Sequence, residues 1–92
     1  MQFEWDGIKA ESNKDKHQGV TFDEAVSCFF DPDQIAFYDP DHSDDEDREI
    51  LVGHSDLGRL LAVSYTLRND AIRIISARKA THREIEDYAR TI

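Results

Sequence analysis

The sequence has one cysteine, two prolines and no long hydrophobic run, and each shortage narrows the possible classes of protein. Because Cys28 has no second cysteine to pair with, an internal disulfide is excluded and a reducing compartment is favoured. A membrane helix needs about 20 predominantly apolar residues, and no such run occurs. The first residues lack the apolar core of a signal peptide, so we predict a soluble cytoplasmic protein. A chain of 92 residues predicts a single domain spanning 1–92.

Basic residues are also scarce, since 11 lysines and arginines stand against 20 aspartates and glutamates, for a net charge of −9. This balance argues against simple electrostatic binding of nucleic acid, which usually needs an excess of cations. The charge is uneven, however: residues 21–58 carry twelve acids and one base, whereas residues 59–92 carry seven bases and four acids. Because salt limits the reach of charges to about 8 Å, a basic cleft can exist on an acidic protein.

Three segments have the start signals of helices. Asp6 can cap a helix that runs to about His17. The stretches 21–24 (TFDE) and 81–84 (THRE) are capping boxes, in which each end satisfies a backbone amide of the other. The second helix would end before Pro32. Apolar residues at helical spacing predict the buried faces of the last two helices: Ala25, Val26, Phe29 and Phe30, then Ile85, Tyr88, Ala89 and Ile92.

Alternating apolar residues and turn signals predict the strands. A weak strand signal at 3–5 precedes the first helix. Four apolar segments come after the second helix and are separated by turns: 34–38, 50–54, 59–67 and 71–77. Short connections favour an antiparallel meander. We therefore predict an α+β fold of order β-α-α-β-β-β-β-α, with an antiparallel sheet of four to five strands and helices packed on one face.

The acidic run between Asp39 and Glu49 suggests a calcium site, but its spacing fails. An EF-hand loop needs glycine at position six and glutamate at position twelve, and neither Asp39 nor Asp41 as first residue satisfies both. A solvated loop is the better interpretation. The four histidines form no ligand pair at helical spacing, and we predict neither a metal site nor a cofactor. Cys28 has no neighbouring base and is predicted to be a buried apolar residue.

A more informative cation lies in the last strand. Strict alternation would place Arg73 and Ala77 on one face of the strand and Ser76 on the other. An arginine among apolar neighbours requires a ligand or an acidic partner. Asp23 and Glu24 are candidates for that partner, and the residues leave the two interpretations open.

The start of the last helix is a candidate anion site. Arg78 and Lys79 precede it, and the first amides of the helix belong to His82 and Arg83. The capping residue Glu84 competes for these amides. His82 near the positive end of the helix is a candidate neutral base, although a histidine in such a place is more often simply exposed.

Two stretches of the chain resemble the BrnT family of toxins. The N-terminal stretch is FEWD at 3–6, with Lys9, Asn13, KH at 16–17, GV at 19–20 and Phe22. The C-terminal stretch is RIISAR at 73–78, then Arg83, Glu84 and Tyr88. The resemblance spans nearly the whole chain, with Arg48 and Gly53 between the two stretches. It implies a RelE-like fold and a ribonuclease toxin of a type II toxin–antitoxin pair.

The resemblance also implies partners. It predicts an RNA substrate and a cognate antitoxin with a ribbon-helix-helix-type DNA-binding region, in a complex that represses its own operon. Operator DNA would be contacted only through the antitoxin. The toxin–antitoxin complex is compatible with a dimer of the toxin. The residues leave two alternatives open: a non-catalytic module that binds a basic protein, and a toxin remnant without activity.

Metal-free RNA cleavage needs a base for the 2′-hydroxyl, cations for the charged phosphorane and an acid for the leaving oxygen. We assign Arg73 and Arg78 to the phosphorane charge and Lys16 or His17 to proton transfer, with His82 as an alternative. Further contacts with RNA and phosphate are predicted at Lys14, Ser76, Lys79, His82 and Arg83. The candidates for base stacking are Tyr65 and Trp5, although for Trp5 a place in the core is the favoured interpretation.

One residue departs from the family pattern. Gln18 separates His17 from Gly19, where the family has histidine and glycine in direct succession. An extra residue within a helix would rotate the later helical residues by about 100° and change the aim of His17. An extra residue in the loop would leave the helix unchanged.

Overall fold

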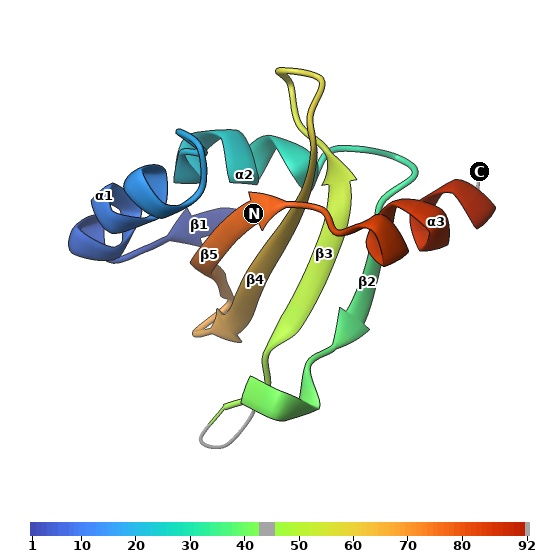
Figure 1. The fold of residues 1–92 in the computed structure, drawn as a ribbon. Helices are drawn as coiled ribbons and strands as arrows, with labels where there is room; N and C mark the ends of the chain where they lie inside the picture. Colours follow the sequence, from blue (N-terminus) through green and yellow to red (C-terminus); the bar gives the residue numbers. More distant parts are fainter. Residues whose placement is uncertain (43–45, 92) are drawn as a thin grey trace.

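The computed structural model describes residues 1–42 and 46–91, which form one sheet with helices on both faces (Figure 1). The predicted order of helices and strands is confirmed, with one short 3-10 helix, η1, added after the second strand. None of the described helices is long and apolar enough to cross a membrane. The elements are β1 (Gln2–Glu4), α1 (Gly7–Lys16), α2 (Phe22–Cys28), β2 (Ile35–Tyr38), η1 (Pro40–His42), β3 (Glu49–His54), β4 (Leu60–Arg68), β5 (Ala71–Lys79) and α3 (His82–Arg90).

The strands lie in the order β1-β5-β4-β3-β2. As predicted, β2 to β5 form an antiparallel meander. β1 differs, because it pairs with β5 in parallel and places Glu4 opposite Arg73. After β1 the chain runs through α1 and α2 and enters the meander at the opposite edge, so β1 lies against the last strand rather than the first. The sheet is therefore mixed, within the predicted α+β class.

The two faces of the sheet have separate cores. On the α1/α2 face, Phe22 and Cys28 pack against strand residues that include Leu61 and Ile74. On the opposite α3 face, Tyr88 packs in a smaller cluster with residues of β3 and β4. Helices therefore lie on both faces, whereas the prediction placed them on one. Successive strand residues point to opposite faces, so the apolar residues on the second face need a cover of their own.

The predicted helix starts are confirmed. Each predicted cap accepts a hydrogen bond from a backbone amide of the first helical turn: Asp6, Thr21 and Thr81. Thr81 and Glu84 form a complete capping box. Glu24 does not complete the box of α2, because its carboxylate accepts hydrogen bonds from Arg59 and Ser55 instead. That carboxylate thereby ties α2 to the turn between β3 and β4.

The buried stripe of α3 is narrower than predicted. Tyr88 is buried, but Ile85 is 44% exposed and Ala89 is exposed as well. Glu84 is buried in their place, because Arg78 on β5 holds its carboxylate against the sheet. Ile92, the last member of the predicted stripe, lies outside the described residues. An ion pair therefore replaces part of the apolar contact between α3 and the sheet.

β5 contains one extra residue. Ser64 of β4 pairs with Ser76, but the next residue, Tyr65, pairs with Ile74. Ile75 therefore has no opposite residue on β4, which is the arrangement of a β-bulge. A bulge interrupts the alternation of side chains between the two faces, so the faces predicted for β5 change at this point.

The bulge decides which side chains of β5 share a face. Ile74 and Ala77 both pack in the core of the α1/α2 face. Arg73, Ser76 and Arg78 consequently share the α3 face. The prediction that Ala77 lies with Arg73 and that Ser76 opposes them is wrong, because strict alternation ends at the extra residue. As a result, the side chains of Arg73, Ser76 and Arg78 all lie on the α3 face of the sheet.

Candidate active site

A buried asparagine fixes α1 against β5. Asn13 is 5% exposed, and its side-chain nitrogen donates to the carbonyl oxygens of Val20 (3.0 Å) and Ala77 (2.8 Å). Its side-chain oxygen accepts from the Ala77 amide at 3.1 Å. Because Ala77 lies directly after the bulge, these bonds hold the end of α1 beside it.

A hollow of about 230 Å³ lies between α1 and the bulge, and we call it the α1 hollow. Its helical side carries two of the residues predicted for proton transfer, Lys16 and His17. Its strand side carries Ser76, which was predicted to contact phosphate. The full lining consists of Lys9, Ser12, Asn13, Lys16, His17, Ile75 and Ser76.

Gln18, the residue that departs from the expected family pattern, lies in the turn after α1. The helix ends at Lys16, with His17 as its C-cap. Gln18 and Gly19 both adopt left-handed backbone conformations, with φ of 57° and 77°. The helix closes normally, since the His17 amide donates to the Asn13 carbonyl. Gln18 therefore lies outside α1, and His17 is the C-cap of the helix.

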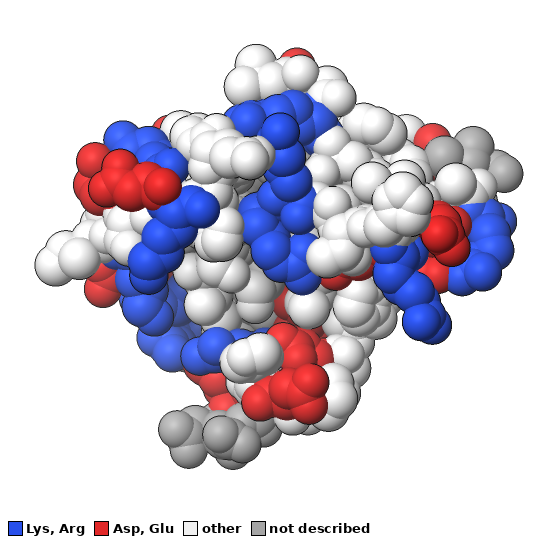
Figure 2. All heavy atoms as spheres, viewed as in Figure 1, with Lys and Arg blue, Asp and Glu red and all other residues white. Residues whose placement is uncertain are grey.

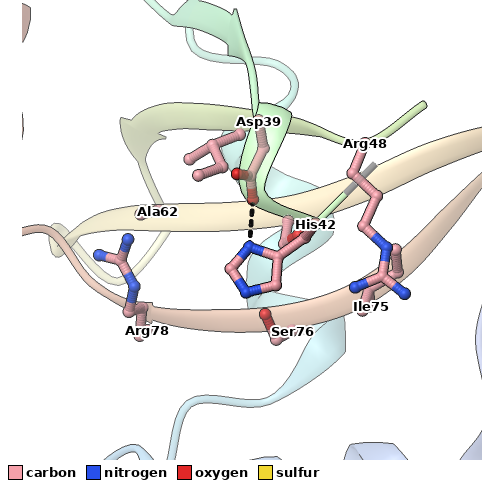
Figure 3. Close-up of a pocket in the computed structure, with 9 residues that line it drawn as sticks. Asp39, His42, Arg48, Ala62, Ile75, Ser76 and Arg78 are labelled. Carbon is pink, nitrogen blue, oxygen red and sulfur yellow. Dashed lines mark hydrogen bonds and ion pairs between the residues drawn. The ribbon is translucent and has the colours of Figure 1, made fainter. Parts of the chain in front are cut away.

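A second hollow, of about 170 Å³, lies on the other side of the bulge, and we call it the η1 hollow (Figure 3). It extends from η1 and the segment before β3 to the middle of β5. Arg78, predicted to stabilise phosphorane charge, lies here. The full lining consists of Asp39, His42, Arg48, Ile50, Ala62, Ser64, Ile75, Ser76 and Arg78.

The two hollows share Ile75 and Ser76 and therefore meet at the bulge, and we call the two hollows together the bulge groove. Figure 2, drawn from the same side as Figure 1, shows Lys and Arg side chains gathered over β5 and on the side of α1. Asp and Glu side chains form one group toward the lower end of this view and further groups beside the cations at its left and right sides. Since charges act over about 8 Å at physiological salt, the groove offers local cations on a protein of net charge −9.

η1 brings to the groove residues that were not among the predicted site residues. The start of the acidic run was interpreted as a solvated loop, yet Asp39 and His42 line the η1 hollow. His42 Nδ1 lies 2.9 Å from Asp39 Oδ2. Arg48, noted only as part of the family pattern, lines the same hollow. The one available signal was the three-residue spacing of Asp39 and His42 around Pro40, which is typical of a turn that brings two side chains together.

Arg78 is held by a bidentate ion pair. Its Nη1 lies 2.7 Å from Glu84 Oε1, and its Nη2 lies 3.0 Å from Oε2. Burial raises the pKa of Glu84, but hydrogen bonds from Arg78 and the Thr81 amide outweigh it and leave the pKa below its ordinary value. The hydrogen bond with Glu84 in turn raises the pKa of Arg78. The ion pair holds the Arg78 guanidinium at the η1 hollow, and the Glu84 carboxylate neutralises part of its positive charge.

Arg73 has an acidic partner, but not the one that was predicted. Its Nη1 lies 2.8 Å from Oε2 of Glu4, the residue paired with it across the parallel β1–β5 ladder. Glu24 is occupied by Arg59, whose hydrogen bond lowers the pKa of the Glu24 carboxyl. Arg73 shares the α3 face with Arg78, but it does not line either hollow.

The remaining predicted contacts lie outside the two hollows. Lys14 forms an ion pair with Glu11 at 2.9 Å on the surface of α1. Three others are exposed around the end of β5 and the start of α3: Lys79, His82 and Arg83. The Thr81 amide donates to Glu84 Oε1 at 2.8 Å, so the capping box occupies part of the predicted anion site.

The two aromatic residues considered for base stacking pack in the protein. Tyr65 is 8% exposed, its ring contacts Phe29, and its hydroxyl donates to Glu49 at 2.6 Å. A ring covered in this way has no free face, so the structure does not support base stacking by Tyr65. Trp5 lies edge-on against Phe22 at 5.9 Å and belongs to the core of the α1/α2 face. The core interpretation of Trp5 is confirmed.

Cys28 is fully buried, as predicted, and burial raises the pKa of its thiol to about 12. Such a thiol is not ionised at neutral pH and does not act as a nucleophile. Within residues 1–42 and 46–91, no three His, Cys, Asp or Glu side chains are grouped as metal ligands. Asp44 and Asp45 of the acidic run lie outside the described residues.

Comparisons with known proteins show which fold and which family the chain has. The chain is similar in fold to the crystal structure of the Brucella abortus ribonuclease toxin, BrnT, with a TM-score of 0.56 and 24% sequence identity over 89% of this chain and 99% of that chain. No curated protein matches the sequence. The model of the family described as the ribonuclease toxin, BrnT, of type II toxin–antitoxin systems matches residues 5–84. The chain therefore belongs to the BrnT family of ribonuclease toxins of type II toxin–antitoxin systems.

Proposed function

We propose that this chain is an active, metal-independent endoribonuclease whose active site is the bulge groove. The observation that carries the proposal is the convergence of Lys16, His17, Ser76 and Arg78, which come from two distant segments of the sequence. The groove contains groups that can transfer protons beside groups that can bind phosphate. RNA supplies its own nucleophile, the 2′-hydroxyl, so the protein needs only these two kinds of group.

The shape of the groove indicates a position for the substrate. A scissile phosphate over Ser76 would have a hollow on each side and the Arg78 guanidinium at one end. The Ser76 hydroxyl would donate to a phosphate oxygen, and Arg78 would stabilise the charge that grows on the phosphorane. Lys16 or His17 would act from the α1 hollow on one of the two proton transfers.

The outlying cations define a path for the RNA backbone. Arg73 lies beyond the bulge on the same face, and we assign it to a flanking phosphate rather than to the reacting one. Charged side chains at a groove margin contribute to affinity through release of counterions and are sensitive to salt. The other margin positions are Lys14, Lys79, His82 and Arg83.

The family implies an antitoxin partner, and we propose its form. It would be a small protein with a ribbon-helix-helix-type DNA-binding region, forming with this toxin a cytoplasmic complex that represses its own operon. The net charge of −9 supports contact with operator DNA through the antitoxin and not through this chain. The exposed carboxylates of Asp41 and Asp47, sequence neighbours of His42 and Arg48 in the η1 hollow, support contact with a basic antitoxin. A toxin dimer within the complex is part of the proposal.

The test is cleavage of a labelled transcript by the purified chain in the presence of EDTA. We expect cleavage by the wild type and its loss in Lys16→Met/His17→Gln. The matched control is Arg90→Met, which removes a cation that pairs with Asp87 on α3 outside the groove. Growth arrest on expression without any RNA cleavage would contradict the proposal and favour a non-catalytic interaction module.

A further inference from the structure

The groove contains a histidine that has no role in the function proposed so far. His42 is the last residue of η1, and its side chain is 66% exposed, whereas that of Asp39 is 11% exposed. The two side chains meet at 2.9 Å between His42 Nδ1 and Asp39 Oδ2. A largely covered carboxylate therefore holds an accessible imidazole.

The contact fixes which nitrogen of His42 is available. A carboxylate only accepts hydrogen bonds, so Nδ1 carries the hydrogen and, in the neutral ring, Nε2 carries the lone pair. Figure 3 shows this second nitrogen on the side of Ser76, where the ring lies over β5. His42 is thus oriented to accept a proton at the bulge.

The surroundings of the ring suit a negatively charged substrate. The charged side chains that line the η1 hollow with His42 are Asp39, Arg48 and Arg78, and the strand adds Ser76. Figure 3 shows the ring between the two arginines. A phosphate between these cations would bring an adjacent 2′-hydroxyl to the imidazole.

A second histidine in the molecule serves as an internal comparison. His54 Nδ1 lies 4.0 Å from Asp31 Oδ2 and 3.1 Å from the Tyr88 hydroxyl. Its ring packs edge-on against Tyr88, and it lines neither hollow. Both histidines thus have a carboxylate nearby, and the position in the groove distinguishes His42 from His54.

We propose that His42, positioned by Asp39, is the general base of the bulge groove. His42 Nε2 takes the proton of the 2′-hydroxyl, and the 2′-oxygen forms a bond to phosphorus as the bond from phosphorus to the 5′-oxygen breaks. Lys16 or His17, in the α1 hollow, gives a proton to the leaving 5′-oxygen. The products are a 2′,3′-cyclic phosphate and a 5′-hydroxyl. This inference rests on the proposed function and divides its two proton transfers between the two hollows.

The test begins with His42→Ala in the full chain. We expect the rate of cleavage of a labelled transcript at saturating RNA to fall by about 10²- to 10⁴-fold, with little change in the concentration needed for half saturation. Added imidazole should restore part of the rate, because it fits the space that the side chain leaves. His54→Gln is the matched control and should cleave at the wild-type rate.

Asp39→Ala tests the positioning role. We expect a smaller loss of rate than in His42→Ala. If Asp39 contributes to cleavage through the histidine, the double variant Asp39→Ala/His42→Ala should be about as slow as His42→Ala. Circular dichroism and the melting temperature of each variant establish that it folds.

The possible outcomes separate this inference from the proposed function. A wild-type chain that does not cleave RNA would overturn both. Cleavage by the wild type, with His42→Ala within about threefold of it, would overturn the inference alone. A folded His42→Ala variant that is slow, binds RNA weakly and does not respond to imidazole would make His42 a binding residue and would also overturn it.

Discussion

The two faces of the sheet use neighbouring residues of the same strand for different purposes. The α1/α2 face is closed, and the side chains of Ile74 and Ala77 lie in its core. On the α3 face the helix covers only part of the strands, and Ile75 and Ser76 line an open groove. The bulge allows both arrangements within four consecutive residues. Residues that stabilise the fold and residues of the proposed active site therefore lie on opposite faces of the sheet, although they are neighbours in the sequence.

The sharpest test of this separation compares Ile74→Ala with Ile75→Ala. Ile74 is 1% exposed, and its truncation removes apolar contacts and leaves a cavity, so the free energy of unfolding should fall by about 2–5 kcal/mol. Ile75 is only partly buried, and its truncation should cost less than half as much. Urea denaturation of both variants measures the difference. Equal losses would mean that the groove side of β5 is as important for stability as the core side.

Asn13→Ala should affect both faces at once. The substitution leaves two carbonyl oxygens and one amide without their partner, which should cost about 2–3 kcal/mol of unfolding free energy. RNA cleavage should fall further than the folded fraction does, because α1 then loses its fixed position beside the bulge. Ser12→Ala, in the same hollow, serves as control. A destabilised Asn13→Ala variant with a full rate per folded molecule would contradict the anchoring role.

The Arg78–Glu84 pair predicts a loss of stability in acid. Because the pKa of Glu84 is lowered in the folded state, its contribution is complete above the ordinary glutamate value of about 4.3 and is lost as the pH falls through the lowered pKa. Glu84→Gln should cost about 1–3 kcal/mol at pH 7. The difference from the wild type should then shrink toward pH 3. Melting temperatures between pH 3 and pH 7 provide the measurement, and a difference that is constant with pH would refute the ionic interpretation.

Ser76→Ala should have the smallest effect on stability and a clear effect on activity. The change removes one hydroxyl from a partly exposed position, so the free energy of unfolding should stay within about 0.5 kcal/mol of the wild type. The cleavage rate should fall on the order of 10- to 100-fold if the hydroxyl donates to the phosphate. An unchanged rate would restrict Ser76 to a role in shaping the groove.

Much of the fold could be predicted from local signals. Capping residues such as Asp6 and Thr81 mark helix starts because their side chains replace missing backbone bonds, and this is a property of the sequence itself. The antiparallel meander could also be predicted, because the short turns between its strands are recognisable in the local sequence. The parallel pairing of β1 and the position of α3 depend on contacts between distant segments, which the local pattern does not contain.

The candidate site was predicted only in part, for related reasons. Lys16 and His17 were assigned after the family resemblance, whereas Arg78 was already part of the anion site predicted at the start of the last helix. The structure brings all three to the groove. The partner of Arg73 required the register of β1 against β5, and the face of Ser76 required knowledge of the bulge. His42 was missed because its importance comes from a turn that places it over a strand more than thirty residues later in the chain.

The chemical identity of the cleaved ends tests the central claim most directly. The proposed groove uses the 2′-hydroxyl of the RNA as nucleophile, so cleavage in EDTA should leave a 2′,3′-cyclic phosphate, or the 3′-phosphate formed from it, and a 5′-hydroxyl. Fragments carrying a 3′-hydroxyl and a 5′-phosphate, or cleavage that appears only when a divalent metal is added, would contradict the proposed mechanism.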